Sequence, residues 1–319
     1  MGVHIPLVTE PPSSSKKHST SAPFIPFIFM GAIFLFCVID IIFGANADIQ
    51  RHDQDIGNIT HILLGPRTNP PDIPSGRPLF DLPRRHVGPV PYGEPIFTCA
   101  QPGHVALTFD DGPSEWTAFV LDELDRHGAK ATFFVTGHAG GRGRRVDDPR
   151  SEWPDLVRRM HGAGHQVGSH TWTHARLDQV DHARLLNEMV YNEMALRNVL
   201  GLVPTYMRPP HGAWQDPARG ALGELGYHIV MFDVDTQDYL NDERDAIQAS
   251  IDIVDAAVRP GGEGAYIVRM QDVREWTALK LLPAVLQTMT LRGYKPVTVG
   301  ECLGDEWFNW YRDPEPDHM

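Results

Sequence analysis

From Val105 onward, short apolar runs alternate with longer stretches of helical periodicity, and this alternation restricts the fold more than any other feature. The apolar runs lie at 105–109, 131–135, 165–168, 205–208, 228–233, 265–270 and 296–299. Helical patterns include 115–127, 182–200 and 276–292, and each is followed by a glycine, as helices often are. Roughly seven strand–helix units predict an α/β fold with a parallel sheet and crossover helices, which could close into a barrel.

The N-terminal part of the chain has a different composition. Residues 1–21 include a polar, serine-rich stretch and are predicted to be a disordered tail, whereas 22–45 are almost wholly apolar and about long enough to cross a bilayer. Lys16 and Lys17 precede this segment, which favours a single-pass type II membrane protein with an extracellular or lumenal domain. The alternative is a cleaved signal peptide and a secreted protein, because Ala45-Asn46-Ala47 resembles a cleavage site.

Residues 46–98 are rich in proline and turn residues and are predicted to be a stem or linker. Asn58 begins an Asn-Ile-Thr glycosylation triplet there, which suits an exported protein. Cys99 and Cys302 flank the predicted domain at 99–304, and a tail is expected at 305–319. Export permits a disulfide between these two cysteines, and two unpaired buried thiols are the alternative. The net charge of −13 argues against nucleic acid as a partner.

Polar residues follow most of the predicted strands. In chain order they are Asp110 and Asp111, His170 and His174, Arg208, Asp235 and Asp238, and Gln271. In a β/α barrel the carboxyl ends of the strands form one face, which holds the active site. The sequence therefore predicts that these side chains gather at one site.

His170 and His174 are four residues apart, so one helical turn places both on one side. With one carboxylate they form a His₂Asp set, typical of a zinc site with an open position, although such a pair alone can also be an ordinary surface or core pair. Asp110 and Asp111 are adjacent, so one could bind the metal while the other accepts a proton from activated water. Arg208 could hold the base through a charge-assisted pair; the alternative is an ordinary surface arginine.

Four motifs, in order, resemble those of the NodB-type polysaccharide deacetylases, carbohydrate esterase family 4. They are TFDDG (108–112), SHTWTH (169–174), RPPHG (208–212) and DTQDY (235–239). The segments YNEMALRNVLG, DTQDYLND and VTVGECLGD are most similar to fungal chitin deacetylases, and the resemblance runs from about Pro91 to the C-terminus.

The resemblance implies a distorted (β/α) barrel that uses a divalent metal, usually zinc, to remove N-acetyl groups from chitin-like polymers. By matching position, Asp111, His170 and His174 bind the metal, which could also be Co²⁺, and Asp110 is the general base. Arg208 tethers that base, and backbone N–H groups near His211 help bind the oxyanion. Asp238 supports the catalytic acid, and a Cys99–Cys302 disulfide closes the domain.

The fifth motif departs from the family pattern. Where the family has Leu-x-His, with an apolar pocket wall and a catalytic acid, this chain has Arg269-Met270-Gln271. Strand alternation places Arg269 and Gln271 on one face, pointing into the site, where Arg269 could pair with Asp238. Glutamine cannot transfer a proton near neutral pH. His211 replaces the usual tyrosine and could supply that proton or be a tolerated substitution, and Tyr239 replaces tryptophan at the substrate side.

Three readings follow from the altered motif. The first is a membrane-anchored, zinc-dependent chitin or N-acetylglucosamine-polymer deacetylase. The second is a pseudoenzyme that keeps the metal site and binds glycan without turnover. In the third, Arg269 recognises an anionic sugar or acid.

Overall fold

The computed structural model describes residues 73–138 and 143–314. The predicted tail at 1–21, the apolar segment at 22–45 and Asn58 lie outside these residues, so they stay predictions. Within the described ranges no helix is both long and apolar enough to span a bilayer.

The main sheet is parallel in all its described pairings and follows the order β1-β7-β6-β4-β3-β2-β9-β8, with β10 paired to β2. Its strands are β1 (Pro95–Ile96), β2 (His104–Asp110), β3 (Thr132–Val135), β4 (Gln166–Ser169), β6 (Tyr206–Met207), β7 (His228–Val230), β8 (Val234–Asp235), β9 (Tyr266–Gln271) and β10 (Lys295–Val297). A separate antiparallel pair joins β5 (Val203–Pro204) to β11 (Tyr311–Arg312). The parallel α/β fold predicted from the sequence is confirmed as a distorted half-barrel.

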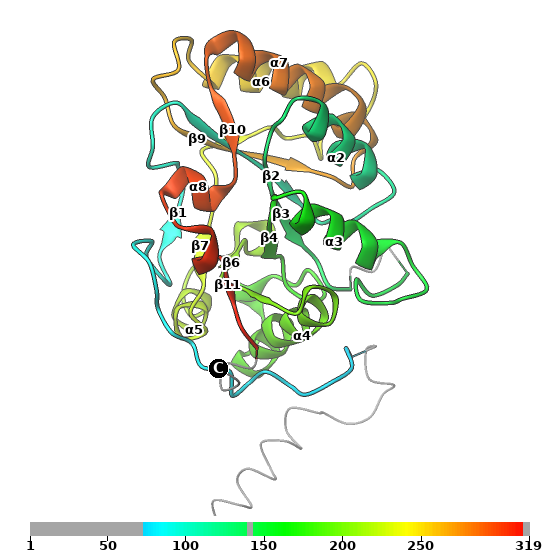
Figure 1. Ribbon diagram of the computed structural model, residues 1–319, viewed down its shortest axis with the longest axis vertical. Helices are drawn as coiled ribbons and strands as arrows, with labels where there is room; N and C mark the ends of the chain where they lie inside the picture. The colour runs from blue at the N-terminus through cyan, green and yellow to red at the C-terminus, as the bar shows by residue number, and fades with distance from the viewer. Residues whose placement is uncertain (1–72, 139–142, 315–319) are drawn as a thin grey trace, which may run out of the picture. The chain divides into compact units, whose positions relative to one another are not determined.

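Helices surround the sheet, as Figure 1 shows, with α6 and α7 at the top of the view and α4 and α5 at the bottom. They are α2 (Thr117–Arg126), α3 (Trp153–Gly162), α4 (His182–Leu200), α5 (Ala218–Glu224), α6 (Ile247–Ala257), α7 (Leu282–Arg292) and α8 (Val299–Leu303). Short helical turns are η1 (Leu177–Gln179), η2 (Pro210–Gly212), η3 (Thr277–Leu281) and η4 (Trp307–Asn309). The glycines after α4 and α7, Gly201 and Gly293, take the left-handed conformation that ends helices.

Strand alternation decides which side chains face the site. In β2, Val105, Leu107 and Phe109 join the large apolar core with residues of α2, α6 and α7. The intervening side chains of β2, which include Thr108 and Asp110, face the opposite way, because successive side chains of a strand point to opposite faces. The same rule applies in β9, where Val268 and Met270 lie in that core and Arg269 and Gln271 point the other way.

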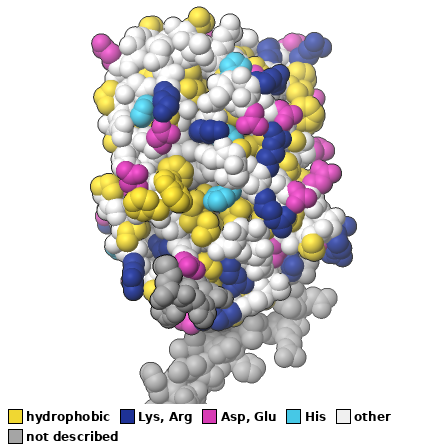
Figure 2. Space-filling model, viewed as in Figure 1, with side chains coloured by type: hydrophobic (Ala, Val, Ile, Leu, Met, Phe, Trp, Pro, Cys, Tyr) yellow, Lys and Arg dark blue, Asp and Glu magenta, His cyan; other side chains and the backbone are white. Residues whose placement is uncertain are grey.

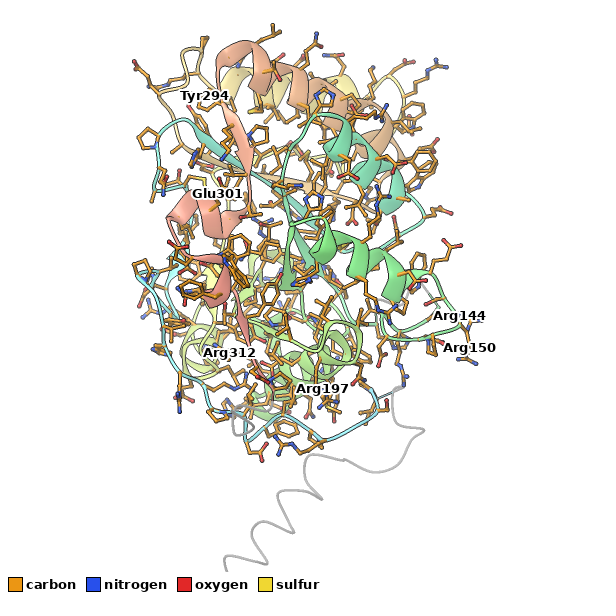
Figure 3. The ribbon with its side chains drawn as sticks, in the orientation of Figure 1. Arg144, Arg150, Arg197, Tyr294, Glu301 and Arg312 are labelled. Carbon is orange, nitrogen blue, oxygen red and sulfur yellow. A yellow bond between two sulfur atoms is a disulfide. The ribbon has the colours of Figure 1, made fainter. Side chains whose placement is uncertain are left out.

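The folded unit extends beyond residues 99–304 at both ends. In the segment predicted to be a stem, Leu79 and Leu82 are buried against α4 residues, and Arg84 forms a salt bridge with the buried Glu193. Arg197 of α4, labelled in the lower part of Figure 3, lies on this side of the molecule. It donates hydrogen bonds to the carbonyl oxygens of Ser75 and Arg77. At the other end β11 adds to the fold, with Arg312 buried. A proline-rich composition disfavours regular helices and strands, but it does not prevent packing.

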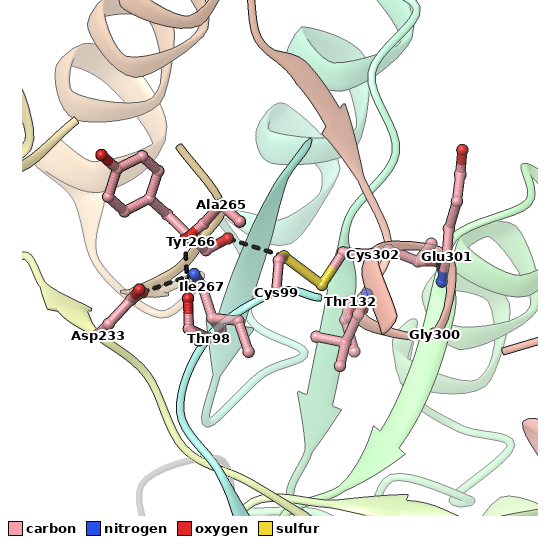
Figure 4. The surroundings of a disulfide bond; sticks show 12 residues. Thr98, Cys99, Thr132, Asp233, Ala265, Tyr266, Ile267, Gly300, Glu301 and Cys302 are labelled. Carbon is pink, nitrogen blue, oxygen red and sulfur yellow. Dashed lines mark hydrogen bonds between the residues drawn. A yellow bond between two sulfur atoms is a disulfide. The ribbon is translucent and has the colours of Figure 1, made fainter. Parts of the chain in front are cut away.

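A disulfide links Cys99, just before β2, to Cys302 in α8, with the two Cα atoms 5.1 Å apart. Figure 4 shows it beside β9, where the backbone N–H of Ile267 donates to Asp233. The backbone N–H groups of Ala100 and Gln101 also donate to the carbonyl oxygen of Cys302. The pairing of the two cysteines is therefore confirmed, and it joins the beginning and end of the domain.

On the face shown in Figure 2, basic and acidic side chains lie interspersed among hydrophobic and neutral ones.

Replacing both Cys99 and Cys302 by alanine should lower the free energy of unfolding by roughly 2–5 kcal/mol, because the bond closes a loop with a sequence separation of 203 residues. Guanidinium titrations of the two proteins would measure the difference. A reductant should destabilise the wild-type protein and leave the double variant unchanged. Equal midpoints without reductant would contradict the prediction.

Candidate active site

The carboxyl ends of five parallel strands carry the polar residues that the sequence singled out. Asp110 ends β2, His170 follows β4, and Arg208 follows β6. Asp235 ends β8 and Gln271 ends β9. Because these strands run parallel in one sheet, their last residues lie at the same edge.

Asp111, His170 and His174 converge, each offering one ligand atom, with these atoms within 4.8 Å of one another. The Nε2 atoms of His170 and His174 lie 3.3 and 3.0 Å from Oδ1 of Asp111. Asp111 and His174 both have positive φ angles, 73° and 60°. Such strained backbone in residues other than glycine gathers at functional sites.

The hydrogen bonding of His170 suits a metal ligand. Its Nδ1 lies 2.7 Å from the carbonyl oxygen of Arg208, which can only accept, so Nδ1 carries the proton and Nε2 presents its lone pair toward Asp111. Two imidazole nitrogens and one carboxylate oxygen are a donor set typical of zinc sites that keep a position open. The three residues therefore fit a divalent ion.

Asp110 is almost completely buried and both of its oxygens accept from arginines. Arg208 Nη1 donates to Oδ1 at 2.8 Å, and Arg269 Nε donates to Oδ2 at 3.0 Å. Burial alone would raise the pKa of Asp110, but the charge of Arg208, together with that of Arg269, outweighs burial and lowers that pKa. Asp110 is thus held as a carboxylate. The arginine that the sequence analysis proposed as its tether is in place.

Arg269 does point into the site, but not toward Asp238. It bridges Asp110 and Asp235, whose Oδ1 lies 3.5 Å from Nη1, and its guanidinium lies over the rings of Phe232 and Tyr239. The expected pairing with Asp238 is wrong because Arg269 and Asp235 are direct neighbours in the β8–β9 register. Tyr239 completes this arrangement by donating from its hydroxyl to Asp235.

Gln271 contacts one of the predicted metal ligands, Asp111, directly. Its side-chain amide donates to Oδ2 of Asp111, and its backbone N–H donates to Oδ2 of Asp238 at 2.7 Å. Asp238 also accepts from the hydroxyl of Thr277. Burial raises the pKa of Asp238 to about 6, although these hydrogen bonds act to lower it.

His211 lies next to the triad, with its ring centroid 4.6 Å from that of His174. Its backbone is left-handed, with φ of 58°. Partial burial, together with the neighbouring charge of Arg176, lowers the pKa of His211. The imidazole therefore lies directly beside the triad.

Two acidic residues at the site escaped the sequence analysis. Asp272 is buried beside Gly112, where a side chain would collide with its carboxylate, and it accepts from the hydroxyl of Thr117. Its position directly after a predicted strand was an available signal. Glu188, in the middle of α4, accepts from Thr173 next to His174. A single acid within a helical pattern gives no such signal.

Comparisons with known proteins agree with this geometry. A family model described as polysaccharide deacetylase matches residues 98–230. A chitin deacetylase of Colletotrichum lindemuthianum is 40% identical over 224 residues, covering 70% of this chain and 88% of the relative. A chitin deacetylase of a Pestalotiopsis species is 40% identical over 223 residues, covering 70% and 71%. The solved structure of the Colletotrichum enzyme has a TM-score of 0.68, with 39% identity, and covers 72% of this chain and 100% of that one.

The titration of Asp238 should make the stability of the metal-free protein depend on pH. Its pKa is higher in the folded protein than the ordinary 3.8, so the folded state binds the proton more tightly and the free energy of unfolding falls as pH rises from about 4 to 7. The difference between about 6 and 3.8 corresponds to roughly 3 kcal/mol. Asp238→Asn, which can accept both hydrogen bonds without charge, should remove this fall.

Urea titrations of wild type and Asp238→Asn at about pH 4.5 and 7.5 would measure this fall in the free energy of unfolding. The stability difference between the two proteins isolates the contribution of Asp238. A difference that is the same at both pH values would contradict the prediction.

Proposed function

Because the chain belongs to the polysaccharide deacetylase family, we propose that it is a metal-dependent hydrolase that removes N-acetyl groups from chitin or a related N-acetylglucosamine polymer. The observation that carries this proposal is the triad of Asp111, His170 and His174 beside a buried, arginine-held Asp110. Similarity to two chitin deacetylases supports the choice of substrate class.

The triad would hold Zn²⁺, or another divalent ion such as Co²⁺. When bound, such an ion supplies Lewis-acid activation of water and of the acetamide carbonyl. Asp110 takes the proton from the attacking water, and Arg208 fixes the orientation of that carboxylate. The backbone near His211 would donate to the developing oxyanion. Tyr239 would contact the substrate at the rim.

The departing amine needs a proton as the C–N bond breaks, and Gln271 cannot supply one. Asp238, which supports the acid position in the family pattern, instead accepts from the backbone of Gln271. The imidazole of His211, whose ring centroid lies 4.6 Å from that of His174, is a group beside the triad that can deliver a proton.

A second candidate function is a pseudo-deacetylase that binds chitin without turning it over. One specific observation favours it: both donors of the altered motif already bind carboxylates of the site. Arg269 donates to Asp110, and Gln271 donates to Asp111. The same engagement weakens the reading in which Arg269 binds an anionic sugar, because its charge is already shared between Asp110 and Asp235.

We also propose that the domain works outside the cytoplasm, either on a single-pass type II anchor at 22–45 or after secretion. The Cys99–Cys302 disulfide supports an oxidising compartment. Glycosylation at Asn58 would fit the same location.

Zinc-loaded wild-type protein should release acetate from N-acetylglucosamine oligomers, and Asp110→Asn should reduce the rate by about 10²–10⁴, because it removes the general base. Acetate formation would be measured directly, with chelator-treated protein as the blank. Undiminished release by Asp110→Asn would exclude Asp110 as the base. If the wild-type protein is silent but binds the oligomers in calorimetry, the binding function is the better description.

Gln271→His restores a proton donor but leaves the hydrogen bond from Arg269 to Oδ2 of Asp110 in place. We therefore expect the single variant to gain less activity than Arg269→Leu/Gln271→His, and the gain of the double variant to exceed the product of the two single gains. The four proteins of this cycle would be compared by acetate release under saturating zinc. Full recovery by Gln271→His alone would show that Arg269 does not restrain the base.

A further inference from the structure

We propose that Glu188 is a positioning residue, which holds the loop of residues 170–174 so that His174 is set to bind the metal. This loop is called the metal loop below. The inference rests on the proposed metal site and goes beyond it, because Glu188 lies on α4 and contributes no ligand atom to the Asp111, His170 and His174 group.

The contact is made by a buried carboxylate. Glu188 is 4% exposed, and its Oε2 accepts from the backbone N–H of Thr173 at 2.6 Å. Its Oε1 accepts from the hydroxyl of the same residue. Thr173 directly precedes His174, so the two hydrogen bonds that Glu188 accepts hold the residue next to the second histidine.

The metal loop needs such support because its backbone is strained. Thr171 and His174 have φ angles of 68° and 60°, a region that residues other than glycine occupy only when their surroundings enforce it. The carbonyl oxygens of Thr171 and Trp172 accept from the backbone N–H groups of Gly137 and His138. These bonds hold the first half of the loop, whereas Glu188 acts on the second half.

The two histidines are held by different means. His170 is 2% exposed and is oriented by the carbonyl oxygen of Arg208. His174 is 28% exposed, so the surrounding packing constrains it less. Fixing Thr173 therefore restricts His174, the less constrained of the two histidine ligands. This lowers the conformational entropy that would otherwise be lost when the metal binds.

The test measures metal affinity rather than activity. The metal-free full chain would be titrated with Zn²⁺ in competition with a chromophoric chelator, and with Co²⁺ while its visible absorption is recorded. Glu188→Gln should weaken Zn²⁺ binding by about 10–100-fold, because its amide group faces one of two donors. Thr173→Val, which loses only the hydroxyl, should weaken binding less, and Thr173→Ser should bind as the wild type does.

Glu193→Gln is the matched control. Glu193 lies on the same helix and is fully buried, but its carboxylate contacts Arg84 and Tyr227 instead of the metal loop. This variant should lower the thermal midpoint and leave the Zn²⁺ affinity unchanged. Thr173→Val keeps the test decisive if Glu188→Gln does not fold.

Wild-type affinity in both Glu188→Gln and Thr173→Val would overturn the inference while leaving the metal site standing. An equal loss of affinity in Glu193→Gln would also overturn it, since the effect would then follow from general destabilisation. Absence of metal binding by the wild-type protein is a distinct result, which would overturn the proposed function together with this inference.

Discussion

The arrangement of the site depends on the buried ion pair between Arg208 and Asp110, each 1% exposed. Besides Asp110, the guanidinium of Arg208 donates to the hydroxyl of Thr108 and to the carbonyl oxygens of Val230 and Met231. Its own carbonyl oxygen fixes His170. One residue thus connects β2 with β7 and orients both the proposed base and a metal ligand. Burying two charges costs several kcal/mol per ion, so a pair this enclosed persists only because nearly every donor has an acceptor.

Strand β9 adds further hydrogen-bond donors to the carboxylates at the site of this buried pair. In the altered fifth motif, Arg269 adds a second cation to Asp110, and Gln271 adds an amide donor to Asp111. Both carboxylates therefore accept hydrogen bonds from a strand that, in the family pattern, would provide an apolar wall and an acid. The charged groups of the site therefore pair with one another within the protein.

The segment that precedes the predicted domain packs against α4. Arg84 and Tyr227 share the carboxylate of Glu193 on α4, and Glu188, five residues earlier on that helix, reaches the metal loop. The N-terminal segment therefore adds to the packing and ion pairing of α4 on a side separate from the metal loop. The disulfide adds a covalent link between the two ends of the domain.

The sequence by itself determined the parallel α/β architecture, the edge that bears the site and the three metal-binding candidates. The architecture and the edge follow from local periodicity, because alternation fixes the face that each side chain takes and parallel strands end on one edge. The choice of Asp111 as the carboxylate ligand came instead from the resemblance of the motifs. Periodicity also placed Arg269 and Gln271 in the site correctly. It could not choose their partners, because β9 lies beside β2 although Arg269 and Asp110 are 159 residues apart.

Strand order and helix packing decided which partners the site residues contact and how the segment before the predicted domain packs. The pairing of Arg269 with Asp235 required the β8–β9 register, and the contact between Glu188 and Thr173 required α4 to lie against the metal loop. The packing of residues 73–97 likewise depends on surfaces of α4 that the linker composition does not reveal. Such contacts join residues distant in the chain, and only the tertiary structure brings them together.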